Sequence, residues 1–148
     1  MKHVKNQMRM SFVSRSSNEG FSRAAVAAFV LPLDPTVAEI SDLKTSVSEA
    51  VTNAIVHAYP DTVGTVYIEA RITDDDRVII KIRDKGIGIP DIAKAMEPLY
   101  TTSSDERAGL GFAVMQSFCD KVRVRSAEGK GTTVTLEKQL HSAYADQR

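Results

Sequence analysis

Apolar and polar side chains alternate, strictly in some stretches of the chain and loosely in others, and we predict five β-strands. The five stretches are residues 7–15, 63–73, 77–83, 122–126 and 132–138. In the clearest of them, alternate residues from Val66 to Ile72 are apolar, and the residues between them carry polar groups. We therefore expect a sheet that is packed on one face and exposed to water on the other.

Apolar residues recur at three- and four-residue steps elsewhere in the chain, and this spacing predicts helices. The predicted helices cover residues 19–30, 37–57, 91–96 and 111–119. Hydroxyl and amide side chains at residues 16–18 and at Thr36 are typical N-caps for the first two helices. Residues 59–61, which include Pro60, are expected to end the second helix because proline lacks a backbone N–H.

Two polar segments predict tight turns between neighbouring strands. Residues 128–131 contain two glycines and join the last two strands. The acidic run from Asp74 to Asp76 lies between the second and third strands. Three consecutive carboxylates could also indicate a metal site, but the strands on either side need a short connection, and we favour the turn.

The order of these elements predicts the fold class. Strands outnumber the helices, and hairpins join them, so we expect an α/β two-layer sandwich in which helices cover one face of a mixed, mostly antiparallel sheet. This order differs from that of a doubly wound dinucleotide-binding fold. Residues 1–140 are expected to form a single domain, followed by a polar C-terminal tail at residues 141–148.

The composition limits the functional classes open to the chain. Its 148 residues are 43% hydrophobic and carry a formal net charge of zero, so no basic excess indicates direct binding to nucleic acid. The longest apolar run, Ala24 to Leu33, is too short to span a membrane, and the N-terminus lacks the apolar core of a signal peptide. The single cysteine, Cys119, is expected in the core and is typical of a reducing compartment. These features predict a cytoplasmic protein.

Two glycine pairs indicate a nucleotide pocket. Asp84 ends a predicted strand and is followed by Gly86 and Gly88, while Gly109 and Gly111 open a predicted helix. Glycines let backbone N–H groups approach a ligand, and a helix start favours phosphate, whereas a carboxylate suits an exocyclic amine such as that of adenine. Either pair alone is more typical of an ordinary turn. Their order, the acid and the polar segment between them (residues 100–107), which we expect to form a lid, favour the pocket.

A polar stripe on the predicted helix 37–57 is a second candidate site. Glu49, Asn53 and His57 are spaced by four residues, so they share one side of the helix and border its apolar face. An ordinary polar helix edge explains the stripe equally well. In the first helix, Glu19 and Arg23 are also four apart, and a weak surface ion pair is a simpler explanation than a partner-binding spot.

Taken together, these motifs resemble the GHKL ATP-binding superfamily, which includes gyrase, Hsp90, histidine kinases and MutL. The matching segments are Glu49-x-x-x-Asn53 (N box), Asp84-x-Gly86-x-Gly88 (G1 box), Gly109-x-Gly111 (G2 box) and the closing Gly131-Thr132-Thr133. Residues 17–23, 33–36, 48–59, 98–102 and 106–112 carry a closer resemblance to the anti-sigma factor serine kinases. The sporulation members, which act on a sigma factor of the sigma-F type, are the nearest; Lys85 and Ala108 depart slightly from the family pattern.

The resemblance implies a serine kinase that binds ATP or ADP with Mg²⁺. It implies that Glu49 orients or deprotonates the attacking serine hydroxyl, that Asn53 coordinates Mg²⁺ and that Asp84 binds the adenine amine. Thr133 is expected to support the base site, and the lid to close over the phosphates, with Arg107 near the γ-phosphate. The implied nucleotide site comprises Asn53, His57, Asp84, Gly86, Gly88, Ile89, Thr101, Thr102, Arg107, Ala108, Gly109, Leu110, Gly111, Phe112 and Thr133.

The same resemblance implies a homodimer with two protein partners. One is the sigma factor, which is held inactive, and the other is an anti-anti-sigma protein that accepts phosphate on a serine. Glu19 and Arg23 are then expected at the partner surface, which reverses the simpler explanation given above. Three alternatives stay open: a stress-response paralogue, a non-catalytic ATP-dependent sigma-binding module, and the catalytic fragment of a histidine kinase or larger GHKL ATPase. Glu49 argues against the module, and the lack of a dimerisation helix with a phosphoacceptor histidine argues against the fragment.

Overall fold

A computed structural model describes residues 3–92, 96 and 111–141, which form one sheet and a layer of helices. In chain order the elements are β1 (Val4–Val13), α1 (Ser17–Val30), the 3-10 helix η1 (Leu31–Leu33), α2 (Val37–Asn53), the π-helical segment η2 (Ala54–Ala58), β2 (Thr65–Thr73), β3 (Arg77–Asp84), α4 (Gly111–Phe118), β4 (Lys121–Ala127) and β5 (Gly131–Gln139). The five predicted strands are present within a few residues of their predicted positions. The predicted lid, residues 93–95 of the short helix predicted at 91–96 and residues 142–148 of the tail lie outside the described residues.

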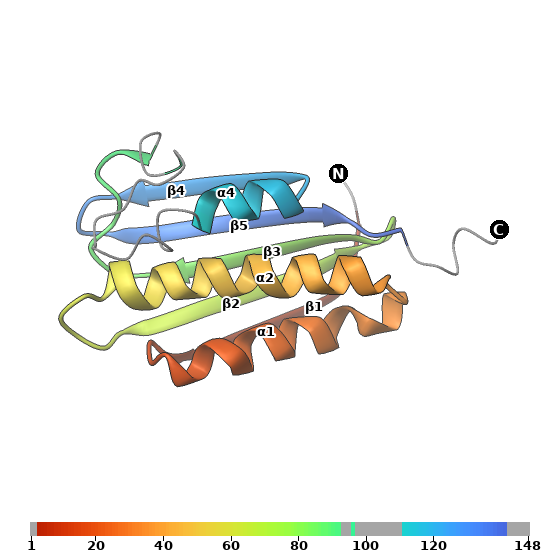
Figure 1. Ribbon diagram of the computed structural model, residues 1–148, viewed down its shortest axis with the longest axis horizontal. Coiled ribbons are helices and arrows are strands. Elements are labelled where there is room, and N and C mark those ends of the chain that lie inside the picture. Colours follow the sequence, from red (N-terminus) through yellow and green to blue (C-terminus); the bar gives the residue numbers. More distant parts are fainter. Residues whose placement is uncertain (1–2, 93–95, 97–110, 142–148) are drawn as a thin grey trace.

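The sheet has the strand order β1-β2-β3-β5-β4 (Figure 1), and each of its four pairings is antiparallel. The predicted two-layer class is confirmed, but the parallel component expected of a mixed sheet is absent from the described strands. The reason is the path of the chain after β3. α4 carries the chain to the far edge, where β4 runs in the same direction as β3. β5 then returns between them and pairs antiparallel with both.

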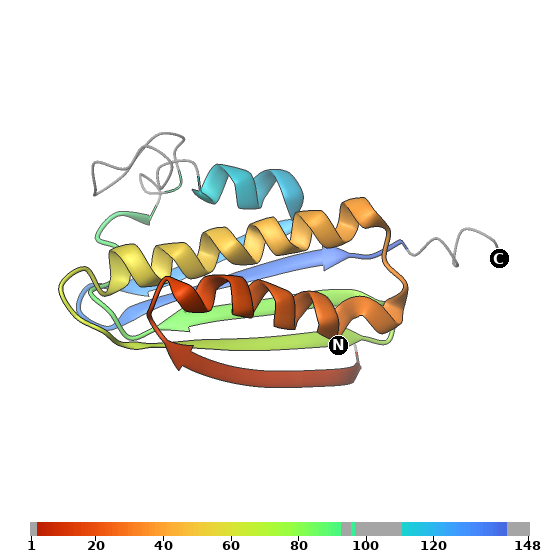
Figure 2. The ribbon, with the colours of Figure 1, turned by 60° about the horizontal axis from the view of Figure 1, so that its bottom comes forward.

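The helices α1, α2 and α4 cover one face of the sheet (Figure 2), and the core lies between these two layers. Burial alternates along β2 and β3 as the sequence predicts, with Ile68 and Ile80 fully buried. They pack in the same cluster as Val47 and Val51 of α2. Each such aliphatic side chain contributes about 1.5–3 kcal/mol by leaving water, so this interface fixes α2 across the sheet.

Local signals explain where the helices begin. Thr36 caps α2 as predicted: its side chain accepts a hydrogen bond from the Glu39 N–H (3.1 Å), and the Glu39 carboxylate accepts one from the Thr36 N–H (2.9 Å). This is a reciprocal capping box. α1 differs from the prediction, because Ser16 occupies the N-cap position without a side-chain hydrogen bond. Asn18 instead donates to the Val13 carbonyl (2.8 Å).

The acidic run between β2 and β3 forms the predicted turn. The Asp76 N–H donates to the Thr73 carbonyl (3.0 Å), and Asp76 takes a positive φ of 63°. Aspartate tolerates this left-handed conformation better than most residues. The turn lies at the opposite end of β3 from Asp84, so its carboxylates are remote from the candidate site.

Cys119 lies against α2 at the end of α4 and is buried, as predicted for a core residue. Its Sγ lies 3.4 Å from the Ser46 Oγ, and burial raises the pKa of the thiol. In the described part of the chain, no helix combines the length and the apolar character needed to cross a membrane.

Candidate functional site

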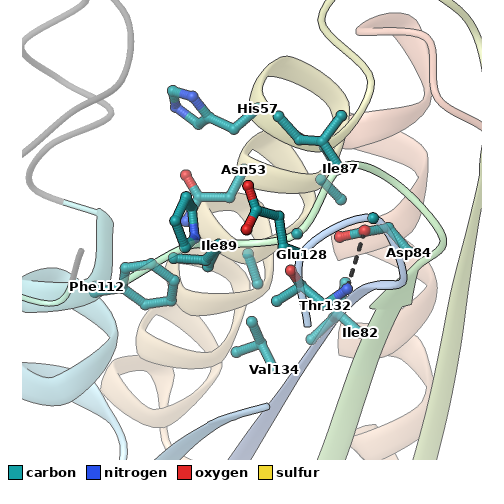
Figure 3. Close-up of a pocket in the computed structure, with 16 residues that line it drawn as sticks. Asn53, His57, Ile82, Asp84, Ile87, Ile89, Phe112, Glu128, Thr132 and Val134 are labelled. Carbon is teal, nitrogen blue, oxygen red and sulfur yellow. Dashed lines mark hydrogen bonds between the residues drawn. The ribbon is translucent and has the colours of Figure 1, made fainter. Parts of the chain in front are cut away.

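A cavity of about 440 Å³ lies between the C-terminal half of α2, the end of β3 and the β4–β5 turn (Figure 3). It is lined by Ala50, Asn53, Ala54, His57, Ala58, Ile82, Asp84, Ile87, Gly88, Ile89, Pro90, Phe112, Glu128, Gly129, Thr132 and Val134. Most of these groups are apolar, and a few polar ones converge on the same space. This combination and volume are typical of a site for a small molecule.

Asp84 is the buried acid of this cavity, with 6% of its surface exposed. Its Oδ1 accepts hydrogen bonds from the backbone N–H groups of Gly86 (2.9 Å) and Thr132 (3.2 Å), and the second bond is drawn in Figure 3. Burial raises the pKa of the Asp84 carboxyl, and these two backbone hydrogen bonds oppose the rise. Among the described residues, Oδ2 receives no hydrogen bond. Asp84 therefore presents a desolvated acceptor that a ligand amine would satisfy.

The loop of residues 85–90 connects Asp84 to the cavity wall, and both of its glycines are required. A Cβ at Gly86 would lie 2.2 Å from the Ala58 carbonyl oxygen, so only glycine permits this approach. Gly88 has a φ of 80°, and a Cβ there would lie 2.3 Å from the Ala127 carbonyl oxygen. The first glycine packs the loop against η2, and the second packs it against the β4–β5 turn.

Hydrogen bonds hold the same loop on two sides. On the η2 side, the Ile87 N–H donates to the Ala58 carbonyl (3.1 Å). On the β4–β5 side, the Ile87 carbonyl accepts from the Gly129 N–H (2.7 Å), and the Ile89 N–H donates to the Ser126 hydroxyl (2.7 Å). The backbone around Asp84 is therefore fixed by the protein itself.

Asn53 lies at the other end of the cavity, on the last turn of α2. Its Nδ2 atom is buried and has no hydrogen-bond partner among the described residues. A buried amide without a partner is costly, and the ends of an Asn side chain can exchange by rotation. The carbonyl oxygen of Asn53 is therefore a suitable ligand for Mg²⁺, which prefers oxygen ligands.

Gly111 brings the start of α4 against this part of α2. A Cβ at Gly111 would lie 3.2 Å from the Glu49 Oε2 and 3.4 Å from the Asn53 Nδ2. Glu49 and Asn53 are one helical turn apart, as their spacing predicts. The structure thus brings three of the predicted site residues together.

Glu49 also lines a second hollow, of about 510 Å³, on the outer surface of α2. Arg23 of α1 and Lys44 of α2 line the same hollow. In α1, the Arg23 Nη1 lies 3.4 Å from the Glu19 Oε1, as the spacing of four predicts. Glu49 therefore borders both the Asn53 region and a hollow that reaches the predicted partner surface at Arg23.

The structure corrects the prediction for Thr133. On β5, Thr132 pairs with Asp84 and lines the cavity, whereas Thr133 pairs with Arg83. Because neighbouring strand residues point to opposite faces, Thr133 faces away from the cavity. The threonine of the closing motif that lines the cavity is therefore Thr132.

The other predicted residues divide into three groups. Those lining the cavity are Asn53, His57, Asp84, Gly88, Ile89 and Phe112. Gly86 and Gly111 shape it without lining it. Thr101, Thr102, Arg107, Ala108, Gly109 and Leu110 lie outside the described residues.

Several lining residues escaped the sequence analysis. Ile82 and Val134 face the same way as Asp84 and Thr132, so strand alternation contained the signal for them. Glu128 lies on the β4–β5 turn and borders the cavity mouth. Nothing in the local sequence pattern distinguishes Glu128 from an ordinary turn residue.

The chain matches the family model described as the histidine kinase-like ATPase domain over residues 7–138. Among curated proteins, it is 52% identical to the anti-sigma F factor of Caldanaerobacter subterraneus over 91% of this chain and 94% of that protein. It is 55% identical to the anti-sigma F factor of Clostridium beijerinckii over 92% of this chain and 96% of that protein.

Among solved structures, the chain resembles a Mycobacterium tuberculosis protein described by its RsbU and RsbW domains, with a TM-score of 0.68 and 20% identity. The match covers 92% of this chain and 33% of that one. A blue-light activated histidine kinase of Erythrobacter litoralis gives a TM-score of 0.59 at 20% identity, over 82% of this chain and 41% of that one. At these identities the two structures show the shared fold.

Proposed function

Since this chain belongs to the histidine kinase-like ATPase domain family and, within it, to the anti-sigma F factors, we propose that it is an anti-sigma factor with serine kinase activity. It would bind a sporulation sigma factor of the sigma-F type in an ATP-dependent manner and hold it inactive. It would also transfer phosphate from ATP to a serine of the anti-anti-sigma antagonist. The likeness in sequence extends over nearly the whole of its relatives, which supports an equivalent role.

The observation that carries the kinase proposal is the position of Glu49. Its carboxylate lies beside Asn53 and the start of α4 and also borders the outer hollow. A hydroxyl entering from the hollow would meet Glu49 before it reached the Asn53 region. Glu49 would orient that hydroxyl and accept its proton while the serine oxygen bonds to the γ-phosphorus and ADP leaves with the bridging oxygen.

The cavity supports adenine nucleotide binding. Asp84 would accept a hydrogen bond from the adenine amine, next to Thr132 and the apolar wall at Ile82. Asn53 would hold Mg²⁺, which supplies charge neutralisation of the phosphates when it is bound. Within the described residues, no group of three acidic, histidine or cysteine side chains could hold a metal alone, so phosphate oxygens and water would complete the shell.

The partner surface in this proposal includes Glu19 and Arg23. Arg23 contributes to the same hollow as Glu49, so a protein docked over α1 could present a serine to the carboxylate. We propose a homodimer as the working form, acting in the cytoplasm. The anti-sigma F relatives favour the sporulation sigma factor over that of a stress-response paralogue.

The test is phosphate transfer. Purified chain is mixed with Mg-ATP and an anti-anti-sigma protein, and phosphoserine on the latter is measured by mass spectrometry. Glu49→Gln is expected to lower transfer by about 100- to 10,000-fold while ADP affinity stays unchanged, because the side chain keeps its shape and loses only its basicity. Glu137→Gln on the opposite face of the sheet is the matched control.

Three outcomes separate the alternatives. Transfer that persists in Glu49→Gln would remove Glu49 from the catalytic role. ATP binding without transfer by the unchanged chain would favour a non-catalytic binding module. Retention of a sigma-F type factor only in the presence of ATP would support the anti-sigma role independently of the kinase reaction.

A further inference from the structure

The hydroxyl of Tyr59 joins two backbone segments at the site end of the sheet. It donates a hydrogen bond to the Thr65 carbonyl (2.9 Å) and accepts one from the Lys85 N–H (2.7 Å). The backbone therefore engages the hydroxyl both as a donor and as an acceptor of hydrogen bonds. Tyr59 immediately follows η2, and Lys85 immediately follows Asp84.

This bridge occupies a particular place in the sheet. β2 and β3 pair in antiparallel register as far as Val66 opposite Asp84. The next opposed pair would be Thr65 and Lys85, and the Tyr59 hydroxyl stands between their backbone groups. The strand can thus end directly after Asp84, because the Tyr59 hydroxyl pairs with both the Thr65 carbonyl and the Lys85 N–H.

The residue before Tyr59 holds the same loop. The Ala58 carbonyl accepts from the Ile87 N–H (3.1 Å), and Gly86 packs against that carbonyl. Two consecutive residues, 58 and 59, therefore fix residues 85–87. This arrangement places the Gly86 N–H within 2.9 Å of the Asp84 Oδ1.

Packing sets the orientation of the Tyr59 ring independently of its hydroxyl. A Cβ at Gly64 would lie 2.3 Å from ring carbons of Tyr59, so the ring lies directly against the Gly64 backbone. That backbone is held by the residue after β1, because the Gly64 N–H donates to the Ser14 hydroxyl (2.9 Å) and the Gly64 carbonyl accepts from the Ser14 N–H (2.9 Å). A phenylalanine at position 59 would keep this packing and lose only the bridge.

We propose that Tyr59 is a positioning residue of the base site: its hydroxyl holds the backbone of residues 85–87 so that the Asp84 carboxylate faces the cavity in the orientation that recognises an amino-purine. The inference rests on the proposed nucleotide-binding function. It adds a residue that does not itself line the cavity and that acts through Asp84.

The test compares ADP with inosine diphosphate, in which an oxygen replaces the exocyclic amine. Calorimetry gives the affinity of each nucleotide for the unchanged chain and for Tyr59→Phe. The ratio of the two affinities is expected to fall by about threefold to tenfold in the variant, as for the loss of one buried hydrogen-bonded bridge. A purely structural loss would weaken both nucleotides equally and leave the ratio unchanged.

Tyr67→Phe is the matched control. The Tyr67 ring lies beneath Arg83 and Lys85, with the Lys85 Nζ 5.2 Å from the ring centroid, and the hydroxyl has no partner among the described residues. This variant is expected to keep the parental ratio. An unchanged ratio of ADP to inosine diphosphate affinity in Tyr59→Phe, or an equal fall in both variants, would overturn this inference and leave the proposed function standing. Failure of the unchanged chain to bind ADP would overturn the proposed function, and this inference with it.

A second measurement uses the unaltered protein and does not depend on the variant folding. Hydrogen exchange followed by NMR is expected to show a Lys85 amide that exchanges at least tenfold more slowly than an exposed loop amide, because its proton is bound to the Tyr59 hydroxyl. Exchange at the rate of an exposed amide would contradict the bridge.

Discussion

At the Asp84 end of the cavity, hydrogen bonds from η2 and from the β4–β5 turn hold the backbone, whereas at the other end the buried Asn53 amide nitrogen has no partner among the described residues. At the first end the protein itself fixes the backbone, and Oδ2 of Asp84 is left to accept a hydrogen bond from a ligand. The second contains a buried polar group that has no partner among the described residues and that a ligand would satisfy. For the proposed nucleotide site, the difference predicts a preorganised base end and a phosphate end that is completed by what binds there.

Asn53→Ala is expected to have the largest effect at the end of the cavity that contains Asn53. The substitution is expected to reduce Mg-dependent phosphate transfer by about 100-fold or more, since the proposed metal ligand is lost. Its effect on the free energy of unfolding is expected to be neutral or slightly stabilising, because the variant removes a buried amide nitrogen that has no partner among the described residues. Transfer assays and urea unfolding without nucleotide measure the two quantities. A large loss of stability would show that Asn53 is a structural residue.

Asp84→Asn examines the preorganised end. ADP affinity is expected to fall by about 10- to 100-fold, because a charged acceptor of the adenine amine is replaced by a neutral amide. Affinity for inosine diphosphate should fall much less. Calorimetry with both nucleotides measures the difference, and an equal fall for the two would place the base elsewhere.

Replacing one glycine by alanine at each end of the cavity tests whether the two ends differ in rigidity. Gly86→Ala places a methyl group 2.2 Å from a backbone carbonyl that is fixed by η2, so it is expected to cost about 1–3 kcal/mol of stability. Gly111→Ala meets only the ends of the Glu49 and Asn53 side chains, at 3.2–3.5 Å, and is expected to change stability by less than about 1 kcal/mol. Thermal and urea unfolding measure both variants. Equal costs would contradict a rigid base end and an adaptable phosphate end.

The smallest expected effect is the dependence of stability on pH. Burial raises the pKa of Asp84 above its ordinary value of 3.8, so the folded state holds this proton more tightly than the unfolded state. As the pH rises from about 4, the unfolded chain loses the Asp84 proton before the folded chain does. The free energy of unfolding of the unchanged chain therefore falls relative to that of Asp84→Asn as the pH passes through the raised pKa. Urea unfolding of both proteins without nucleotide, between about pH 4 and pH 7, measures the difference. A difference that is constant with pH would contradict the raised pKa.

The sequence was sufficient for the features that depend on local physics. Alternation along residues 63–73 and 77–83 predicts which face of β2 and β3 is buried, because side chains alternate in any strand. Neighbouring backbone groups likewise require a cap, a turn or the absence of a side chain at particular positions. These positions are Thr36, the turn at 74–76 and the glycines at 86 and 88.

The tertiary structure decided the features that depend on pairing between distant segments. Thr132 and Thr133 are adjacent and chemically identical, and only the register of β5 against β3 selects Thr132 for the cavity. The antiparallel position of β5 between β3 and β4 likewise follows from the path after α4. The role proposed for Tyr59 can be inferred only when residues 65 and 85 are brought opposite each other, because its two backbone partners are far apart in the sequence.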